Sequence, residues 1–257
     1  MSRNVIVVEY DPEWPKLFAE EAERIREALG ENCVAVEHVG STAVPGLAAK
    51  PRLDIVPVVK DGFKSIQPLE KLGHVYRGAF NIPYHWGYSK REAGIEINLH
   101  VFEEGSVEIT LNTLFRDYLR AHPEVRDAYG ALKKRLVDIP GAAEKNGGRF
   151  IGYTLGKDQF IKDVLKKAGF HGRYIRFCEH FDEWKAAEKL FGRDLTPYKN
   201  SHHAHFVFYD TVEIVGYALY SISEEGAKLE FAALPKQLER HFVPLCQKWL
   251  NSSSGGM

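Results

Sequence analysis

A small polar turn and a lone carboxylate follow each other near the start of this 257-residue chain. The apolar run 34–36 leads into Gly40 and Ser41, where glycine lets the backbone approach a ligand and amide and hydroxyl groups can donate to an anion. A second apolar run carries Asp54, a side chain suited to the magnesium that accompanies nucleotide phosphates. Two neighbouring strands, expected over 33–39 and 53–59, would therefore present a phosphate site.

Further candidates lie on both sides of this turn and in two later helices. Lys50 could reach a phosphate as a point charge, although a surface lysine beside proline is the ordinary alternative. His38 could orient the turn or contact substrate, or it could be a core histidine. Tyrosine and lysine one helical turn apart could point at a base or phosphate, or lie on a solvated helix face. The residues expected to bind substrate or phosphate are His38, Gly40, Ser41, Thr42, Lys50, Tyr129, Lys133 and Lys157.

An alternating stretch at 95–102 predicts another strand, with its apolar residues facing a core. Glu96 and His100 would then share the opposite face. Either could complete a metal site or act as a general base, since histidine titrates near neutral pH. The expected catalytic residues are Asp54, Glu96 and His100, with Asp54 as the ligand of Mg²⁺, although a solvated sheet face is the alternative for Glu96 and His100.

The motif around the turn resembles the signature of the GrpB family. The resemblance rests on 38–42 (HVGST), 45–47 (PGL), Lys50-Pro51 and Asp54-Ile55, and it extends upstream to 10–15 and downstream to about residue 161. It covers about the first two thirds of the chain. It implies a nucleotidyltransferase-like fold, a mixed sheet with flanking helices, in a family whose members mostly lack an established reaction. The implied ligand is a nucleoside triphosphate.

One position departs from the pattern of nucleotidyltransferases of this fold. The carboxylate expected two residues beyond Asp54, on the same strand face, is replaced by Val56. The sequence therefore favours binding of a nucleotide or nucleotide cofactor over Mg-dependent nucleotidyl or phosphoryl transfer to a small acceptor. Whether the chain is an enzyme stays open, and a non-catalytic binding or assembly module is an alternative.

The remainder of the chain resembles part of a GNAT acetyltransferase in its order of helix, strands and helix. The Gly-rich turn that holds the coenzyme A pyrophosphate in such enzymes is missing, since no glycine occurs in 227–254. Coenzyme A-dependent N-acetylation is therefore a disfavoured alternative. The histidines His203 and His205 share a strand face, but no acidic or cysteine partner is near in sequence, which favours a polar strand entrance over a metal site.

These observations predict an α+β chain with a GrpB-like domain at 1–169, a smaller partial GNAT-like α/β domain at 170–250 and a disordered tail at 251–257. A formal net charge of -1 offers no basic footprint, so nucleic acid is an unlikely partner and a small molecule or nucleotide is expected. Three widely spaced cysteines and the lack of a long apolar stretch indicate a cytoplasmic protein without membrane spans. The short second domain leaves a homodimer open.

Overall fold

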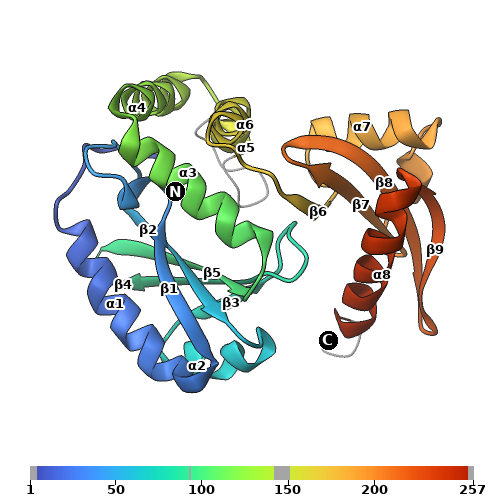
Figure 1. Cartoon of the computed structure of the whole chain (residues 1–257), viewed down its shortest axis with the longest axis horizontal. Helices are drawn as coiled ribbons and strands as arrows, with labels where there is room; N and C mark the ends of the chain where they lie inside the picture. The colour runs from blue at the N-terminus through green and yellow to red at the C-terminus, as the bar shows by residue number, and fades with distance from the viewer. Residues whose placement is uncertain (1–4, 93, 142–150, 254–257) are drawn as a thin grey trace. The chain divides into compact units, whose positions relative to one another are not determined.

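The computed structural model describes residues 5–92, 94–141 and 151–253, which form two compact units. The described residues of 1–78 and 85–170 belong to the first unit, and those of 79–84 and 171–257 to the second (Figure 1). No helix in the described ranges is both long enough and apolar enough to cross a membrane.

The first unit is built on a mixed five-stranded sheet in the order β1-β2-β5-β4-β3. Strand β2 runs parallel to β5, while the other neighbours are antiparallel. The strands are β1 (Cys33–Val39), β2 (Arg52–Val59), β3 (Val75–Gly78), β4 (Trp86–Glu92) and β5 (Ile95–Glu103). The mixed sheet with flanking helices agrees with the expected architecture.

The α-helices in the described part of this unit are α1 (Trp14–Leu29), α2 (Ile66–Lys71), α3 (Val107–Ala121), α4 (Pro123–Asp138), α5 (Ile151–Leu155) and α6 (Asp158–Lys167). Helix α1 buries Ala22, Ile25 and Leu29 at helical spacing and ends at Gly30, whose φ of 51° favours glycine. Helix α5 ends at Leu155 and α6 begins at Asp158, so that Lys157 lies directly before α6.

The two faces of the sheet meet different helices. Phe18 of α1 stacks on His38 of β1, with ring centroids 4.5 Å apart. The neighbouring Glu37 points to the other face, where it accepts a hydrogen bond from Arg116 of α3. Because Val39 pairs with Asp54 across the ladder, Asp54 lies on the face of Glu37 and α3, opposite to α1.

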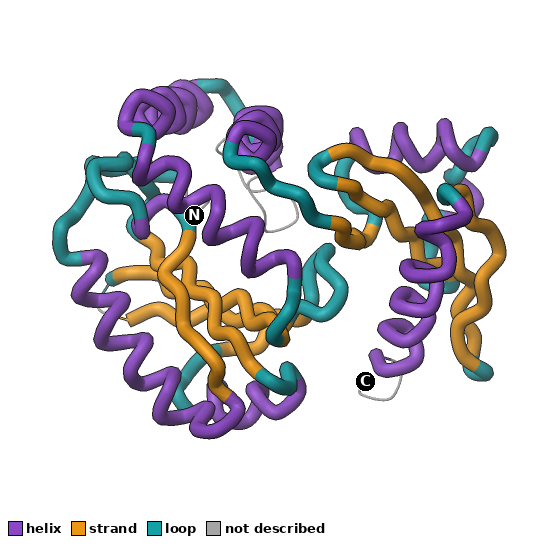
Figure 2. Tube along the Cα trace, in the orientation of Figure 1, coloured by secondary structure: helices purple, strands orange, loops and turns teal. Residues whose placement is uncertain are grey.

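The second unit is a four-stranded antiparallel sheet with one long helix on each face (Figure 2). Its elements are β6 (Arg173–Phe177), α7 (Phe181–Phe191), β7 (His203–Asp210), β8 (Glu213–Ser223), β9 (Gly226–Ala233) and α8 (Lys236–Ser253). The edge strand β6 was not expected from the sequence, because five residues with two arginines give a weak strand pattern. The antiparallel sheet with its helices agrees with the α+β class expected for the chain, whereas the partial GNAT-like α/β domain stays a prediction.

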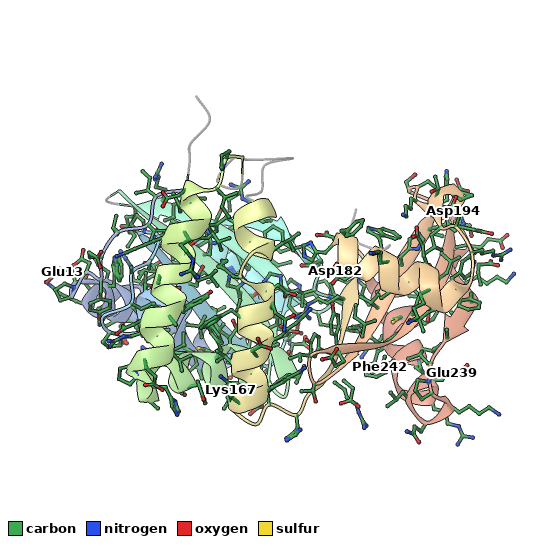
Figure 3. All side chains as sticks on the ribbon, turned by 90° about the horizontal axis from the view of Figure 1, so that it is seen from above. Glu13, Lys167, Asp182, Asp194, Glu239 and Phe242 are labelled. Atoms are coloured by element: carbon green, nitrogen blue, oxygen red, sulfur yellow. The ribbon has the colours of Figure 1, made fainter. Side chains whose placement is uncertain are left out.

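Alternate residues of β7 supply two separate cores. Phe206 and Phe208 pack with α8, whereas Val207 packs with α7. On α8, Phe242 is buried and Glu239 is exposed (Figure 3). The helix continues to Ser253, three residues into the tail that the sequence predicted to be disordered, and residues 254–257 of that tail lie outside the described residues.

Candidate functional site

The Gly40 turn lies directly against the Asp54 carboxylate. Gly40 has φ +70°, and a Cβ atom added there would lie 2.6 Å from Asp54 Oδ2. A contact of that length is a steric clash, so only glycine allows the strand β1 to turn at this point beside Asp54. The close backbone approach predicted for Gly40 is thus made to Asp54.

A small pocket of about 90 Å³ opens beside this contact. Strand β2, the turn after β1, α4, α5 and the residue before α6 all contribute to it. Its lining residues are Ser41, Lys50, Arg52, Asp54, Lys133, Tyr153 and Lys157. Five residues that the sequence nominated are therefore brought together from segments as far apart as 41 and 157: Ser41, Lys50, Asp54, Lys133 and Lys157.

Lys133 is a buried amine that ties α4 to the turn. Its side chain is among the fully buried ones, and its Nζ donates to Ser41 Oγ at 2.9 Å and to the carbonyl oxygen of Ala48. Burial lowers the pKa of Lys133 to about 7, and the charges of Lys157 and Lys50 act in the same direction. Because Ser41 Oγ accepts from Lys133, the Ser41 hydroxyl proton is available to donate elsewhere.

Lys50 and Lys157 share one aromatic ring. Their Nζ atoms lie 4.3 Å and 4.5 Å from the ring centroid of Tyr153, which is 1% exposed. Burial lowers the pKa of Lys50 to about 7, helped by Arg52 and Lys157. Burial also lowers the pKa of Lys157 to about 8, with Arg52 adding to the effect. Each amine is therefore crowded by other cations, a situation that an anion would relieve.

Arg52 and Glu96 form a pair across the parallel strands β2 and β5. They are register partners, and Arg52 donates to Glu96 Oε2 from Nη2 at 2.8 Å and from Nε at 3.1 Å. Arg52 was not among the nominated site residues, although it shares a strand face with Asp54 by the two-residue period. The carboxylate that the sequence offered as a partner for Asp54 is engaged by an arginine.

Two histidines extend from the Asp54 carboxylate in space: His100 lies next to Asp54, and His85 lies next to His100. His100 Nε2 lies 3.9 Å from Asp54 Oδ1, and His100 Nδ1 lies 3.1 Å from Nε2 of the fully buried His85. Burial acts to raise the pKa of Asp54, but the adjacent His100 and the charges of Arg52 and Lys157 outweigh it, so the pKa is lowered. Sequence reasoning missed His85, whose contact with His100 depends on the pairing of β4 with β5.

His38 and Thr42 lie beside the turn but do not line the pocket. His38 is 7% exposed, stacks on Phe18, and has Nε2 3.1 Å from Thr42 Oγ1. Burial lowers the pKa of His38 to about 4, with Arg120 and Arg116 contributing. His38 is therefore a neutral core histidine, the alternative that the sequence analysis gave for this residue. It packs against the turn from the side of α1.

Tyr129 also lies behind the pocket, not in its lining. It is 4% exposed and stacks on Phe160, while Lys133 Nζ is 4.7 Å from its ring centroid. Its role in the structure is to pack beneath Lys133.

Metal-ligand clusters are absent from the described residues, where no three His, Cys, Asp or Glu side chains converge to hold an ion. In the second unit, His203 Nδ1 lies 2.8 Å from Asn200 Oδ1. His205 lies between the Tyr217 hydroxyl at 2.7 Å and the Tyr198 carbonyl oxygen at 2.8 Å. Both ring nitrogens of His205 and Nδ1 of His203 thus lie within hydrogen-bonding distance of protein groups, and the preference for a polar strand entrance stays a prediction.

The model of the family described as GrpB protein matches residues 4–167, which include every residue of the pocket. The chain belongs to the GrpB family. A UPF0157 protein of Halalkalibacterium halodurans is 40% identical over 64% of this chain and 83% of that protein. The glutamate-rich protein GrpB of Alkalihalophilus pseudofirmus is 31% identical over 63% of this chain and 95% of that protein.

A crystal structure of GrpB from Enterococcus faecalis covers 63% of this chain and 96% of its own, at 35% identity and a TM-score of 0.56. A structure of Cid1 with the UTP analog UMPNPP covers 50% of this chain and 42% of its own at 12% identity, with a TM-score of 0.30. The nucleotidyltransferase relation inferred from the sequence stays a prediction. So does the GNAT resemblance, because the family match ends at residue 167.

Proposed function

We propose that this GrpB-family protein binds the phosphate end of a nucleotide or of another small phosphorylated molecule in the pocket beside Asp54. The observation that carries the proposal is the convergence of Lys50, Arg52, Lys133 and Lys157 on one pocket, in which the described lining residues include one carboxylate. A phosphate group carries a charge of about -1.5 to -2 at neutral pH and three strong acceptor oxygens. The amines and the Ser41 hydroxyl supply donors for such a group.

The size of the pocket limits what enters it. About 90 Å³ corresponds to roughly three waters, while sites that enclose a whole small molecule span about 300–1,000 Å³. A phosphate group fits this space and a nucleobase does not. The remainder of a nucleotide would extend past Asp54 and His100, whose side chains are 30% and 31% exposed.

Transfer of the bound group to an acceptor is a further step. His100 beside Asp54 is the candidate general base for it, since an imidazole held near a carboxylate can take a proton from an acceptor hydroxyl. A binding module without this step would have the same pocket. The two differ in whether ATP is consumed when a hydroxyl acceptor is present.

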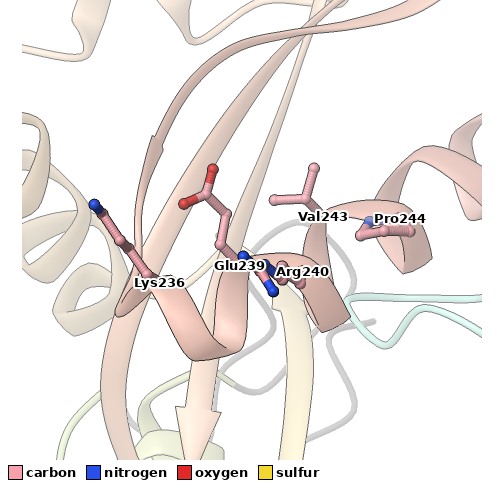
Figure 4. A pocket seen from close by; sticks show the side chains of 5 residues that line it. All are labelled: Lys236, Glu239, Arg240, Val243 and Pro244. Atoms are coloured by element: carbon pink, nitrogen blue, oxygen red, sulfur yellow. The ribbon is translucent and has the colours of Figure 1, made fainter.

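Coenzyme A-dependent acetylation has less support. Only Leu234 and Pro235 connect β9 to α8, and Pro235 has no backbone N–H for a pyrophosphate. The hollow at the start of α8, about 380 Å³, is lined by Lys236, Glu239, Arg240, Val243 and Pro244 (Figure 4). It lacks the glycine turn that such a cofactor uses.

A thermal-shift panel tests the proposal with ATP, GTP, CTP, AMP, inorganic phosphate and acetyl-coenzyme A, each with and without Mg²⁺. We expect phosphate compounds to raise the Tm of the protein, and Lys157→Ala to abolish most of the shift. Lys64→Ala, at a side chain that is 75% exposed, is the matched control and should keep it. The proposal fails if no phosphate compound shifts the Tm, and a response to acetyl-coenzyme A alone would favour acetyl transfer.

A further inference from the structure

The pocket is poor in carboxylates and rich in cations. This composition affects whether a phosphate enters with bound Mg²⁺ or without it. Mg²⁺ bound with phosphates is held by one or two carboxylates, and a two-metal centre stabilises both reacting oxygens. Among the described residues, Asp54 is the only carboxylate in the lining. The donor set therefore does not fit a two-metal centre.

Two positions that the sequence analysis considered for a further carboxylate, Val56 and Glu96, are both engaged in other ways. Val56, on the strand face of Asp54, has 0% exposure and belongs to the core. Glu96 accepts two hydrogen bonds from Arg52. Recruiting Glu96 to a metal would leave the Arg52 guanidinium beside the ion without this partner.

The positively charged groups around the pocket repel a dication and attract an anion. Lys50, Arg52 and Lys157 face the same pocket as Asp54, and Lys133 closes it from α4. A Mg²⁺ ion at Asp54 would share this small pocket with these cationic groups and would be repelled by their positive charge. A phosphate without metal would be attracted by all of them.

We propose that the pocket takes its phosphate in a metal-free form, with the lysines and Arg52 supplying the positive charge that Mg²⁺ would otherwise bring. This inference rests on the proposed function and names its ligand class: a phosphomonoester or polyphosphate without chelated metal. Asp54 then serves as a counter-charge to Arg52 and Lys157.

Calorimetric titration of the full chain with ATP and with AMP, in EDTA or in excess Mg²⁺ at ionic strength matched with NaCl, tests this. ATP should bind in EDTA and weaken in Mg²⁺, with the apparent Kd rising about tenfold when a tenth of the ATP remains metal-free. AMP chelates Mg²⁺ much more weakly than ATP and should show little change. Binding of ATP that requires Mg²⁺, or that Mg²⁺ tightens, would overturn the inference and leave phosphate binding intact.

The variant Asp54→Asn distinguishes a carboxylate that acts as a counter-charge from one that acts as a metal ligand. As a counter-charge its loss should tighten AMP binding in EDTA by a factor on the order of ten, the size expected when solvent screens the interaction about as strongly as bulk water does. As a metal ligand its loss should abolish Mg²⁺-dependent binding instead. Asp127→Asn on α4 removes the same charge from a side chain that is 63% exposed and should leave the Kd unchanged. If neither ATP nor AMP binds in any condition, the proposed function itself fails.

Discussion

Gly40 and Asp54 touch across the turn that ends β1, so closely that a single added methyl group at Gly40 would overlap Asp54 Oδ2 at 2.6 Å. The carboxylate is thereby fixed between the turn and Arg52, Lys157 and His100, which act on its pKa. A polar pocket whose walls restrain one another in this way is held in shape before a ligand arrives.

Replacing Gly40 by alanine should destabilise the protein by about 2 kcal/mol or more, because positive φ and the overlap with Asp54 both oppose a side chain. Urea unfolding measures this change. Gly73→Ala is the matched control, since Gly73 has φ +86° and no atom within 4 Å of an added Cβ. Equal losses for the two variants would show that the contact with Asp54 is not important.

Acid should destabilise the protein through His38. Its folded-state pKa of about 4 lies below the ordinary 6.5, so between these values the unfolded chain binds a proton that the folded chain does not. The free energy of unfolding therefore falls as pH decreases through this window, by about 3 kcal/mol in total. Urea titrations from pH 7 to 4 should show a shallower fall in His38→Gln than in His171→Gln, a change at an exposed site.

At pH 8 the protein should take up protons from the buffer when it binds phosphate. Burial holds the pKa values of Lys50 and Lys133 at about 7, so both amines are largely neutral there, and a bound anion favours their protonated forms. Titrations with AMP in two buffers of different ionisation enthalpy report the number of protons bound. Identical heats in the two buffers would contradict this expectation, and Lys50→Met should reduce the uptake.

Glu96→Gln distinguishes a structural partner from a catalytic group. Removing the charge that pairs with Arg52 should tighten phosphate binding by a factor on the order of three to ten, since one negative charge near the ligand is lost. Isothermal titration with AMP gives the Kd. Glu23→Gln, at a side chain that is 67% exposed, should leave it unaltered. Weaker binding in Glu96→Gln would instead support the role first expected for this residue.

Phe242→Ala should destabilise the second unit by about 3 kcal/mol, because it empties part of the core between α8 and Phe208. The unfolding transition of the second unit, followed by far-UV circular dichroism, should move to lower denaturant concentration. AMP affinity should not change if the two units unfold separately. Glu239→Ala, one helical turn earlier and exposed, is the control for altering α8 itself.

The sequence by itself determined much of the fold. Period-two alternation marked β5, and Gly40 with Asp54 marked the edge of the pocket, because these patterns depend on neighbours along the chain. The motif at 38–55 also identified the family. The spacing of tyrosine and lysine also identified two candidate pairs, Tyr129 with Lys133 and Tyr153 with Lys157. It did not predict where these side chains lie relative to the Gly40 turn.

Only the tertiary structure decided how these residues meet. The parallel register of β2 with β5 places Glu96 beside Arg52. The pairing of β4 with β5 brings His85 next to His100. Packing of α4 and of the break before α6 brings Lys133 and Lys157 to one small pocket. Burial among like charges then lowers the lysine pKa values, an effect of distances between segments as far apart in sequence as Lys50 and Lys157, which no local pattern encodes.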